Sequence, residues 1–326
     1  MHSVAKTAMS LMSFAVTTGV KCSSCDAQAI YLARYNGQHY CKSHFCEFVE
    51  NRVKKEIREQ RIFDRGSRIA VAVSGGKDSM TTLHLLRLLS SARRGTEIIA
   101  ITVDEGISGY RDESMKLVGD YCESNGIQWL TRSYADFAGF TMDALAATER
   151  ERTTCAYCGV FRRTLINALA KETCSDVLAT GLNLDDTAQS ILMNLARGDS
   201  DRFAMMGPHE ASVEGLVPRV QPLRQLPENE VMLYAEIRSI PYLRSSCPYS
   251  EEASRNLFRE IVLRIEDEMP GSRYAMLRTI SKMHKTRSGG SARRCSECGD
   301  TTSSEVCRAC ALRLEASRLT GTAQSS

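Results

Sequence analysis

The chain of 326 residues contains thirteen cysteines, and their spacing predicts metal or redox chemistry. Eight of them form four CxxC pairs. An odd total argues against a framework of disulfides, which small secreted domains use in place of a large core. We therefore expect reduced thiols in a cytoplasmic protein.

Two groups of these residues have the spacing of tetrahedral zinc sites, which take four thiolate or imidazole ligands. The C-terminal group consists of two CxxC knuckles: Cys295, Cys298, Cys307 and Cys310. The N-terminal group replaces the last cysteine with a histidine: Cys22, Cys25, Cys41 and His44. His39 and Cys46 are rival ligands, and His44 is preferred because its spacing from Cys41 repeats that of the first knuckle.

The remaining CxxC pair, Cys155 and Cys158, has no second pair near it in the sequence. Such a pair is typical of a thioredoxin-like redox centre, of half a zinc site, or of part of a three-thiolate iron–sulfur site. Spacing alone leaves these three interpretations open. Three other cysteines are expected to be ordinary buried thiols: Cys46, Cys122 and Cys174.

The segment SGGKDS at residues 74–79 has the composition of a phosphate-binding loop. Its glycines allow close backbone approach, and the free amides of a helix N-terminus bind anionic oxygens. Lys77 adds a positive charge, and the hydroxyls of Ser74 and Ser79 are expected to donate to phosphate. Asp78 is expected to orient a Mg²⁺ ion or to cap the helix. The loop is shorter than a Walker A motif.

The elements that position these residues alternate between strand and helix patterns. Strands are predicted at residues 68–74, 97–104, 128–132 and 176–180, with a possible edge segment at 217–224. Helices are predicted at residues 45–63, 80–91, 113–124, 159–173, 187–197, 232–239, 251–268 and 311–319. This alternation predicts an α/β fold with a parallel, doubly wound sheet. Tyr31 and Tyr35 precede a hairpin turn expected at Asn36-Gly37.

Composition excludes several classes of protein. A hydrophobic share of 43% provides a core, so disorder of the whole chain is excluded. No run approaches the roughly 18–20 apolar residues of a membrane span, and residues 1–20 lack a secretory pattern. The net charge is only +3, so a nucleic-acid footprint would have to be local. Residues 269–294, with seven Lys or Arg and no acid, are the main candidate; the basic residues at 45–68 are interleaved with acids.

SGGKDS resembles the signature of the PP-loop ATP pyrophosphatases, which adenylate a carbonyl oxygen and release pyrophosphate. From about residue 22 to about residue 314, the chain resembles the tRNA 2-thiouridine synthetases of that superfamily. The resemblance rests on both zinc groups, DEGISGYRD at 104–112, CAYCGVFRR at 155–163, GLNLDD at 181–186 and the isolated Cys247. DEGISGYRD and CAYCGVFRR are more similar to the wobble-uridine branch of archaea and eukaryotes.

The resemblance implies roles for individual residues. Cys155, Cys158 and Cys247 match the thiolates that hold a [4Fe–4S] cluster, and Cys155, Cys247 and Asp186 match catalytic positions. The ATP pocket would comprise Val73, Ser74, Gly75, Gly76, Lys77, Asp78, Ser79, Asp104, Arg162 and Gly181. Arg162 stands where some relatives carry a lysine near the phosphates, and Leu182 where many carry a histidine.

The implied reaction is ATP-dependent adenylation of a tRNA uridine C2 oxygen, followed by sulfur transfer to give 2-thiouridine at the wobble position. Thiolation of a T-loop uridine or of a cytidine is the alternative. The sulfur would be carried by the open iron of the cluster, or as a persulfide on Cys155 or Cys247. The implied cofactors are ATP, Mg²⁺, two Zn²⁺ and the cluster. The partners would be tRNA, a ubiquitin-like thiocarboxylate protein or free sulfide as donor, and a second copy of the chain.

Two rival classes remain: another PP-loop ligase, and a zinc-ribbon nucleic-acid binder that has lost catalysis. Intact SGGKDS and Asp186 argue against the binder, and the flanking zinc groups argue against other PP-loop enzymes. The predicted organisation is an extension at 1–20, a zinc finger at 21–46, a PP-loop catalytic domain at 47–268, a basic arm at 269–294, a second zinc finger at 295–319 and a tail at 320–326.

Overall fold

A five-stranded, all-parallel sheet forms the centre of the molecule, with strand order β5-β4-β3-β6-β7. The computed structural model describes residues 19–64, 68–91, 93, 95–200, 203, 206–207, 215–252, 255–283 and 293–322. The strands are β3 (Arg68–Ala72), β4 (Glu97–Asp104), β5 (Gln128–Ser133), β6 (Val177–Ala179) and β7 (Arg219–Val220). In chain order this is the doubly wound arrangement 3-2-1-4-5, which confirms the predicted fold class.

The strands are apolar on both faces because helices cover both. Ile69 and Val71 of β3 belong to one core cluster, while Ala70 between them belongs to the other. The first cluster is closed by α2 (Lys42–Glu59), α3 (Lys77–Ser90), α4 (Tyr110–Ser124) and α10 (Glu228–Ile237). The second is closed by α5 (Tyr134–Ala138), α6 (Met142–Ala146), α7 (Thr154–Glu172) and α13 (Arg308–Thr320). Successive strand residues point to opposite faces, so alternate side chains enter alternate cores.

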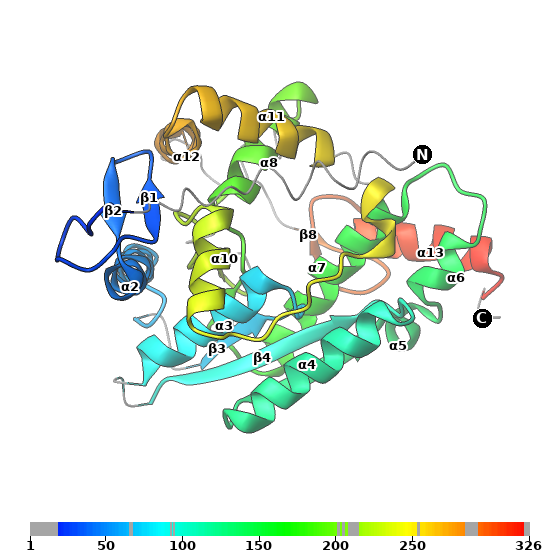
Figure 1. The fold of residues 1–326 in the computed structure, drawn as a ribbon. Coiled ribbons are helices and arrows are strands. Elements are labelled where there is room, and N and C mark those ends of the chain that lie inside the picture. Colours follow the sequence, from blue (N-terminus) through cyan, green and yellow to red (C-terminus); the bar gives the residue numbers. More distant parts are fainter. Residues whose placement is uncertain are drawn as a thin grey trace.

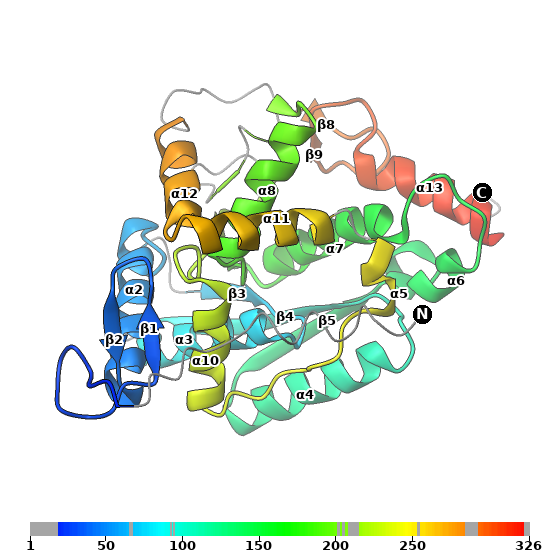
Figure 2. The ribbon, with the colours of Figure 1, turned by 45° about the horizontal axis from the view of Figure 1, so that its top comes forward.

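Three further helices form a layer above one end of the sheet. In Figures 1 and 2, α11 (Arg255–Glu268) and α12 (Ser272–Met283) lie over α8 (Leu184–Ala196). A short 3-10 helix, η1 (Pro248–Glu252), precedes α11. None of the helices in the described part of the chain combines the length and apolarity that crossing a membrane requires.

The N-terminal module is a small hairpin fastened to the sheet domain through a buried carboxylate. Strands β1 (Tyr31–Ala33) and β2 (Gln38–Tyr40) pair around a turn at Asn36-Gly37, as predicted, with Gly37 at φ +71°. Glu230 on α10 accepts hydrogen bonds from Tyr31 Oη at 3.0 Å and from Tyr35 Oη at 2.6 Å. Burial raises the pKa of Glu230, and the nearby Arg52 opposes that shift.

The C-terminal module lies on the other side of the sheet domain, as both views show (Figures 1 and 2). It contains the short strands β8 (Arg293–Arg294) and β9 (Thr301–Thr302) and ends with α13. Helix α13 packs on α7, where Leu312 and Ala316 are buried and Tyr157 Oη donates to Glu315. The two cysteine-rich modules therefore attach to different helices of one sheet domain.

The structure corrects several predictions about elements. Helix α7 begins at Thr154 rather than at residue 159, so the CxxC pair lies in its first two turns. The polar stretch before it contains α5 and α6, which Ser133 and Thr141 cap through their side chains. Cys174 is exposed rather than a buried thiol, whereas Cys46 and Cys122 are buried as expected.

The predicted basic arm is in part a packed helix. Residues 272–283 form α12, and Arg273 is buried against Asp185 at 2.5 Å and Glu266 at 3.4 Å. The arm prediction counted charges within the segment and missed these acidic partners, which lie outside it. Residues 284–292 of the predicted arm lie outside the described residues, as do 1–18 and 323–326.

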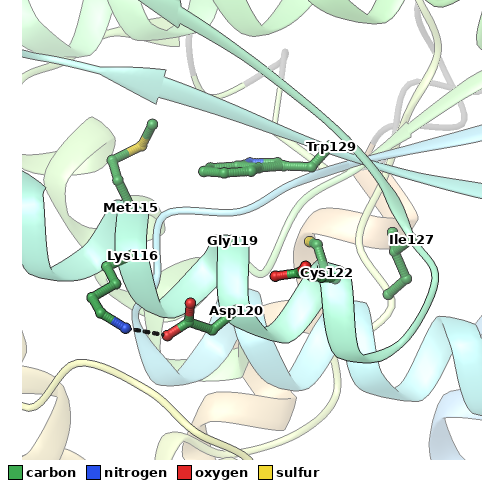
Figure 3. Close-up of a pocket in the computed structure, with 8 residues that line it drawn as sticks. Met115, Lys116, Gly119, Asp120, Cys122, Ile127 and Trp129 are labelled. Carbon is green, nitrogen blue, oxygen red and sulfur yellow. Dashed lines mark hydrogen bonds and ion pairs between the residues drawn. The ribbon is translucent and has the colours of Figure 1, made fainter.

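Trp129, the single tryptophan, lies at the margin of the core rather than inside it. Its indole ring covers Gly119 of α4 beside a shallow hollow (Figure 3). A Cβ atom at Gly119 would come within 2.9 Å of the ring, so only glycine allows this contact. The residues that line the hollow come from α4, β5 and the turn between them, and the predicted ATP and sulfur residues lie elsewhere.

Candidate active site

The SGGKDS segment at residues 74–79, called the PP-loop below, lies at the carboxyl end of β3. It is next to the point where the order of the strands reverses, because β4 follows on one side of β3 and β6 on the other. β4 and β6 flank β3, and ligands of doubly wound sheets bind at such a switch point. The loop's shape depends on Ser79, whose hydroxyl donates to Gly76 O at 2.9 Å and accepts from Ser74 N at 3.1 Å. Ser79 is buried, and these two hydrogen bonds use its hydroxyl to shape the loop; its binding of phosphate stays a prediction.

Two glycines allow the loop to pack closely against its neighbours. Gly75 has φ +83°, and a Cβ atom there would come within 2.9 Å of Ser114 Cβ. Gly181, after β6, would place a Cβ atom 2.9 Å from the backbone of Asp78 and Ser79. The segment after β6 therefore touches the first turn of α3 directly, which brings the GLNLDD motif to the loop.

Asp186 lies in the first turn of α8, and Asp78 in the first turn of α3. Asn183 caps α8 by accepting from Asp186 N at 2.9 Å and also donates its side-chain amide to Asp78 Oδ1 at 3.0 Å. Gly76, not Asp78, is the N-cap of α3. Burial raises the pKa of Asp186 to about 6, although Arg255, 3.3 Å away, opposes that shift.

Lys77 has acidic partners on two helices. Its Nζ atom lies 2.8 Å from Asp78 Oδ2 and 2.8 Å from Glu228 Oε1 of α10. Arg259 of α11 lies 3.1 Å from Glu228 Oε2. The described part of the pocket therefore combines cations with carboxylates, as binding of a nucleotide and a divalent cation requires.

The three cysteines predicted to hold a cluster approach one another at a neighbouring position. Cys155 and Cys158 lie at the start of α7; Cys155 Sγ donates to Tyr249 O at 3.5 Å, two residues beyond Cys247. Cys158 and Cys247 pack against the same core cluster. Burial raises the pKa of the Cys247 thiol, and the charge of Cys158 acts in the same direction.

These cysteines fit an iron–sulfur cluster by the chemistry of the donors. All three thiols are partly exposed, and Cys158 Sγ accepts a hydrogen bond from Arg162 Nη2 at 3.1 Å and one from Tyr134 Oη at 3.5 Å. Hydrogen bonds to sulfur are a main way in which proteins tune such clusters. Arg162 thus lies at the sulfur site, and no contact with the phosphate loop is found for it among the described residues.

A buried carboxylate connects the two sites. Glu105, directly after β4, lies 2.9 Å from Arg162 Nε and 2.6 Å from Arg111 Nε. Arg111 in turn donates to Ser74 O at 3.0 Å and to Val103 O. The sulfur of Cys158 and the backbone of the PP-loop are therefore joined through Arg162, Glu105 and Arg111.

The segment that carries Cys247 also passes along the PP-loop. Leu243 N donates to Gly75 O at 2.9 Å, four residues before Cys247. The carboxylate of Asp104 accepts from Gly106 N at 2.8 Å and so stabilises the turn after β4. The PP-loop and the cysteines thus lie at the same end of the sheet, where the strands have their carboxyl ends.

The two predicted zinc groups are assembled. In each group the four ligand atoms lie within 4.8 Å of one another: Cys22, Cys25, Cys41 and His44, and Cys295, Cys298, Cys307 and Cys310. His44 Nδ1 lies 3.4 Å from Cys41 Sγ, whereas the rival Cys46 is buried in the core. Burial raises the pKa of Cys22, but hydrogen bonds from backbone amides and His44 outweigh it, so the pKa falls to about 6. A hydrogen bond from Cys307 N lowers the pKa of Cys295 to about 6.

Sequence reasoning missed five residues of this site: Glu105, Arg111, Asn183, Glu228 and Arg259. Glu105 and Arg111 lie within the DEGISGYRD motif, and Asn183 within GLNLDD, so motif membership was a signal for them. Glu228 and Arg259 carry no such signal, because their partners lie 151 and 31 residues away in the chain.

Comparisons with known proteins agree with this architecture. A family model described as "PP-loop domain" matches residues 45–266, and one described as "2-thiouridine synthetase TtuA, N-terminal LIM domain" matches residues 21–46. The "tRNA 2-thiolation protein NcsA" of Haloferax volcanii is 35% identical, covering 90% of this chain and 98% of that protein. The "Cytoplasmic tRNA 2-thiolation protein 1" of Drosophila melanogaster is 32% identical, covering 89% and 86%.

A solved structure gives the same result. The U34-tRNA thiolase NcsA from Methanococcus maripaludis, solved with its [4Fe–4S] cluster, superposes with a TM-score of 0.80 and 32% identity. The match covers 90% of this chain and 96% of that one. This chain therefore belongs to the PP-loop family that includes the NcsA and cytoplasmic tRNA 2-thiolation proteins.

Proposed function

We propose that the protein is an ATP-dependent tRNA sulfurtransferase that converts the wobble uridine to 2-thiouridine. The observation that carries the proposal is the common location of two chemistries. The segment that contacts Gly75 through Leu243 continues to Cys247. The proposed ATP loop and the three thiols therefore lie together at the carboxyl ends of the strands. The names of the relatives, including a thiolase of U34, support the same reaction.

The PP-loop would carry out the activating step. A uridine C2 oxygen is a poor leaving group, and adenylation makes it part of a phosphate ester that leaves as AMP. Backbone amides at the N-terminus of α3 and the charge of Lys77 would stabilise the departing pyrophosphate. Asp186, ionised above its pKa of about 6, and Asp78 provide the carboxylates beside the loop.

The sulfur site would supply the nucleophile. A [4Fe–4S] cluster held by Cys155, Cys158 and Cys247 would leave one iron without a protein ligand and so provide a place for sulfide. Arg162 donates to the Cys158 sulfur and keeps positive charge beside it. Glu105 holds Arg162 and Arg111 together, which keeps the sulfur site in register with the PP-loop.

The tRNA would be held by local positive charge rather than by the net charge of +3. Arg278 and Lys282 on α12 are exposed, and Arg293 precedes the C-terminal cysteine set. Arg273 is excluded from this role because it is buried between acids. Substitution of one of these exposed basic residues should weaken the binding of all tRNAs to a similar extent and reduce the salt dependence of that binding.

Several finer features complete the proposal. Each assembled cysteine set would bind one Zn²⁺, and Mg²⁺ would accompany ATP. The sulfur donor would be a ubiquitin-like thiocarboxylate protein or free sulfide, and the enzyme would act as a homodimer in the cytoplasm. The name of the Drosophila relative supports the location. Native mass spectrometry would test the dimer and the metal count together.

The test is thiolation of unmodified tRNA by anaerobically purified protein with ATP, Mg²⁺ and sulfide. Mass spectrometry of nuclease digests would locate the sulfur, and AMP release would report activation. We expect 2-thiouridine at the wobble position, with AMP formation that depends on tRNA. Sulfur at a T-loop uridine or at a cytidine would contradict the proposed target. AMP formation without any thiolation in the cluster-loaded protein would contradict the proposed reaction.

A further inference from the structure

The lysine of the PP-loop is paired with an acid that comes from another helix. Lys77 Nζ lies 2.8 Å from Glu228 Oε1, and both side chains are less than one-fifth exposed. The backbone amide of Glu228 donates to Asp185 Oδ2 at 2.7 Å, which fixes the start of α10 at this position. The contact is therefore a built feature of the pocket and not a chance encounter of two surface chains.

Glu228 also holds a second cation. Arg259 Nη2 lies 3.2 Å from Oε1 and 3.1 Å from Oε2 of the same carboxylate. Arg259 projects from α11, which lies above the sheet domain (Figure 2). Its side chain is 45% exposed, so it has room to change its position. One carboxylate thus bridges the PP-loop lysine and an arginine from a separate helix.

The charges of this pocket neutralise one another. Lys77, Arg255 and Arg259 face three acids, Asp78, Asp186 and Glu228, within 3.3 Å. An incoming polyphosphate gains a cation only where an acid releases it. Among these acids Glu228 contacts two of the cations, so its displacement frees Arg259 and leaves Asp78 as the remaining carboxylate partner of Lys77.

We propose that Glu228 is an anionic placeholder for the ATP polyphosphate, and that Arg259 is a phosphate-binding residue of the same pocket. This inference rests on the proposed function. A carboxylate and a phosphate accept hydrogen bonds from the same donors, and an arginine fork binds either. When the polyphosphate enters, it replaces Glu228 as the partner of Lys77 and Arg259. The two cations then also face the pyrophosphate that leaves.

The proposal predicts opposite effects from two substitutions on the two sides of one contact. Glu228→Gln keeps the shape of the side chain but removes the charge that competes with phosphate. We expect it to tighten binding by up to about fivefold, the range for an ion pair with an exposed partner. Arg259→Ala removes a charge-assisted hydrogen bond and should weaken binding by about tenfold or more. Arg259→Lys keeps the charge without the fork and should lie between.

The measurement is isothermal titration calorimetry on the full chain, anaerobically purified and without tRNA. The probes are Mg²⁺–α,β-methylene-ATP, inorganic pyrophosphate and AMP. Both effects should appear with the first two probes and be absent with AMP, which lacks the β- and γ-phosphates. Arg264→Ala, an exposed arginine on the same helix, is the matched control and should leave all three affinities unchanged. Thermal unfolding of each variant verifies that it is folded.

Three results would overturn the inference. Weaker binding of the ATP analogue in Glu228→Gln would assign Glu228 to nucleotide or cation binding. If Arg259→Ala leaves the affinity for the ATP analogue unchanged, the contact of Arg259 with Glu228 is only a structural ion pair. Equal losses for AMP and the ATP analogue would place Arg259 away from the β- and γ-phosphates. Failure of the unsubstituted protein to bind the ATP analogue would instead contradict the proposed function.

Discussion

Glu105 offers a direct test of the connection between the two sites. Its carboxylate is 3% exposed and lies 2.6 Å from the guanidinium of Arg111, whose side chain is 4% exposed. Arg162, the second partner at 2.9 Å, is 44% exposed at its side chain. The substitution Glu105→Ala leaves Arg111 buried without a carboxylate, and leaves Arg162 able to reach water.

The size of the effect follows from these two environments. Removing one partner of a buried ion pair destabilises a protein by about 3–5 kcal/mol. Arg111 keeps its hydrogen bonds to Ser74 O and Val103 O, so we expect the lower end, about 3 kcal/mol. The half-exposed pair with Arg162 adds about 0–1 kcal/mol. The two contributions together are about 3–4 kcal/mol, and at about 2–4 °C per kcal/mol the melting temperature should fall by about 6–16 °C.

The assay is thermal unfolding followed by circular dichroism on anaerobically purified protein, with Glu113→Ala as control. Glu113 is exposed on α4, so its removal should change the melting temperature by no more than about 2 °C. Melting temperatures that coincide for the two variants would refute the reasoning, since the buried pair would then contribute nothing.

Three further predictions concern the loop, its acid and the metals. Gly181→Ala would place a methyl group 2.9 Å from backbone atoms of Asp78 and Ser79; we expect about 1–3 kcal/mol of destabilisation and weaker ATP binding, whereas unchanged ATP affinity would show that the contact relaxes freely. Because burial raises the pKa of Asp186 to about 6 and its ionised form is needed, tRNA-dependent AMP formation should fall as the pH drops through about 6. Arg255→Ala removes the charge that lowers this pKa, so the midpoint should move to higher pH; a midpoint that stays in place would exclude Asp186 as its source. Cys247→Ala should lose about four iron atoms per chain and keep about two zinc, measured by mass spectrometry of the metals, while two zinc and no iron in the unsubstituted protein after reconstitution would favour persulfide chemistry.

The sequence alone determined the fold class and the identity of the main groups. Buried parallel strands are short and apolar on both faces, so the run at 97–104 was predicted with the bounds that β4 has. The spacing of a CxxC pair depends only on local sequence, because two ligands with two residues between them can face the same metal. Both cysteine sets assemble as their spacing predicted. SGGKDS identified the phosphate loop because its glycines are required wherever backbone approaches an anion.

Only the tertiary structure decided which charges meet. Arg162, predicted in the ATP pocket, contacts the Cys158 sulfur, and Glu105 holds it there; its role toward ATP stays a prediction. Arg273, counted with the basic arm, is buried against Asp185, 88 residues away in the chain. Glu228 reaches Lys77 of the PP-loop from a helix 151 residues further along the chain, and Arg259 pairs with Glu228 from another helix. Ion pairs of this kind depend on how helices pack and not on local pattern, so no spacing rule reveals them.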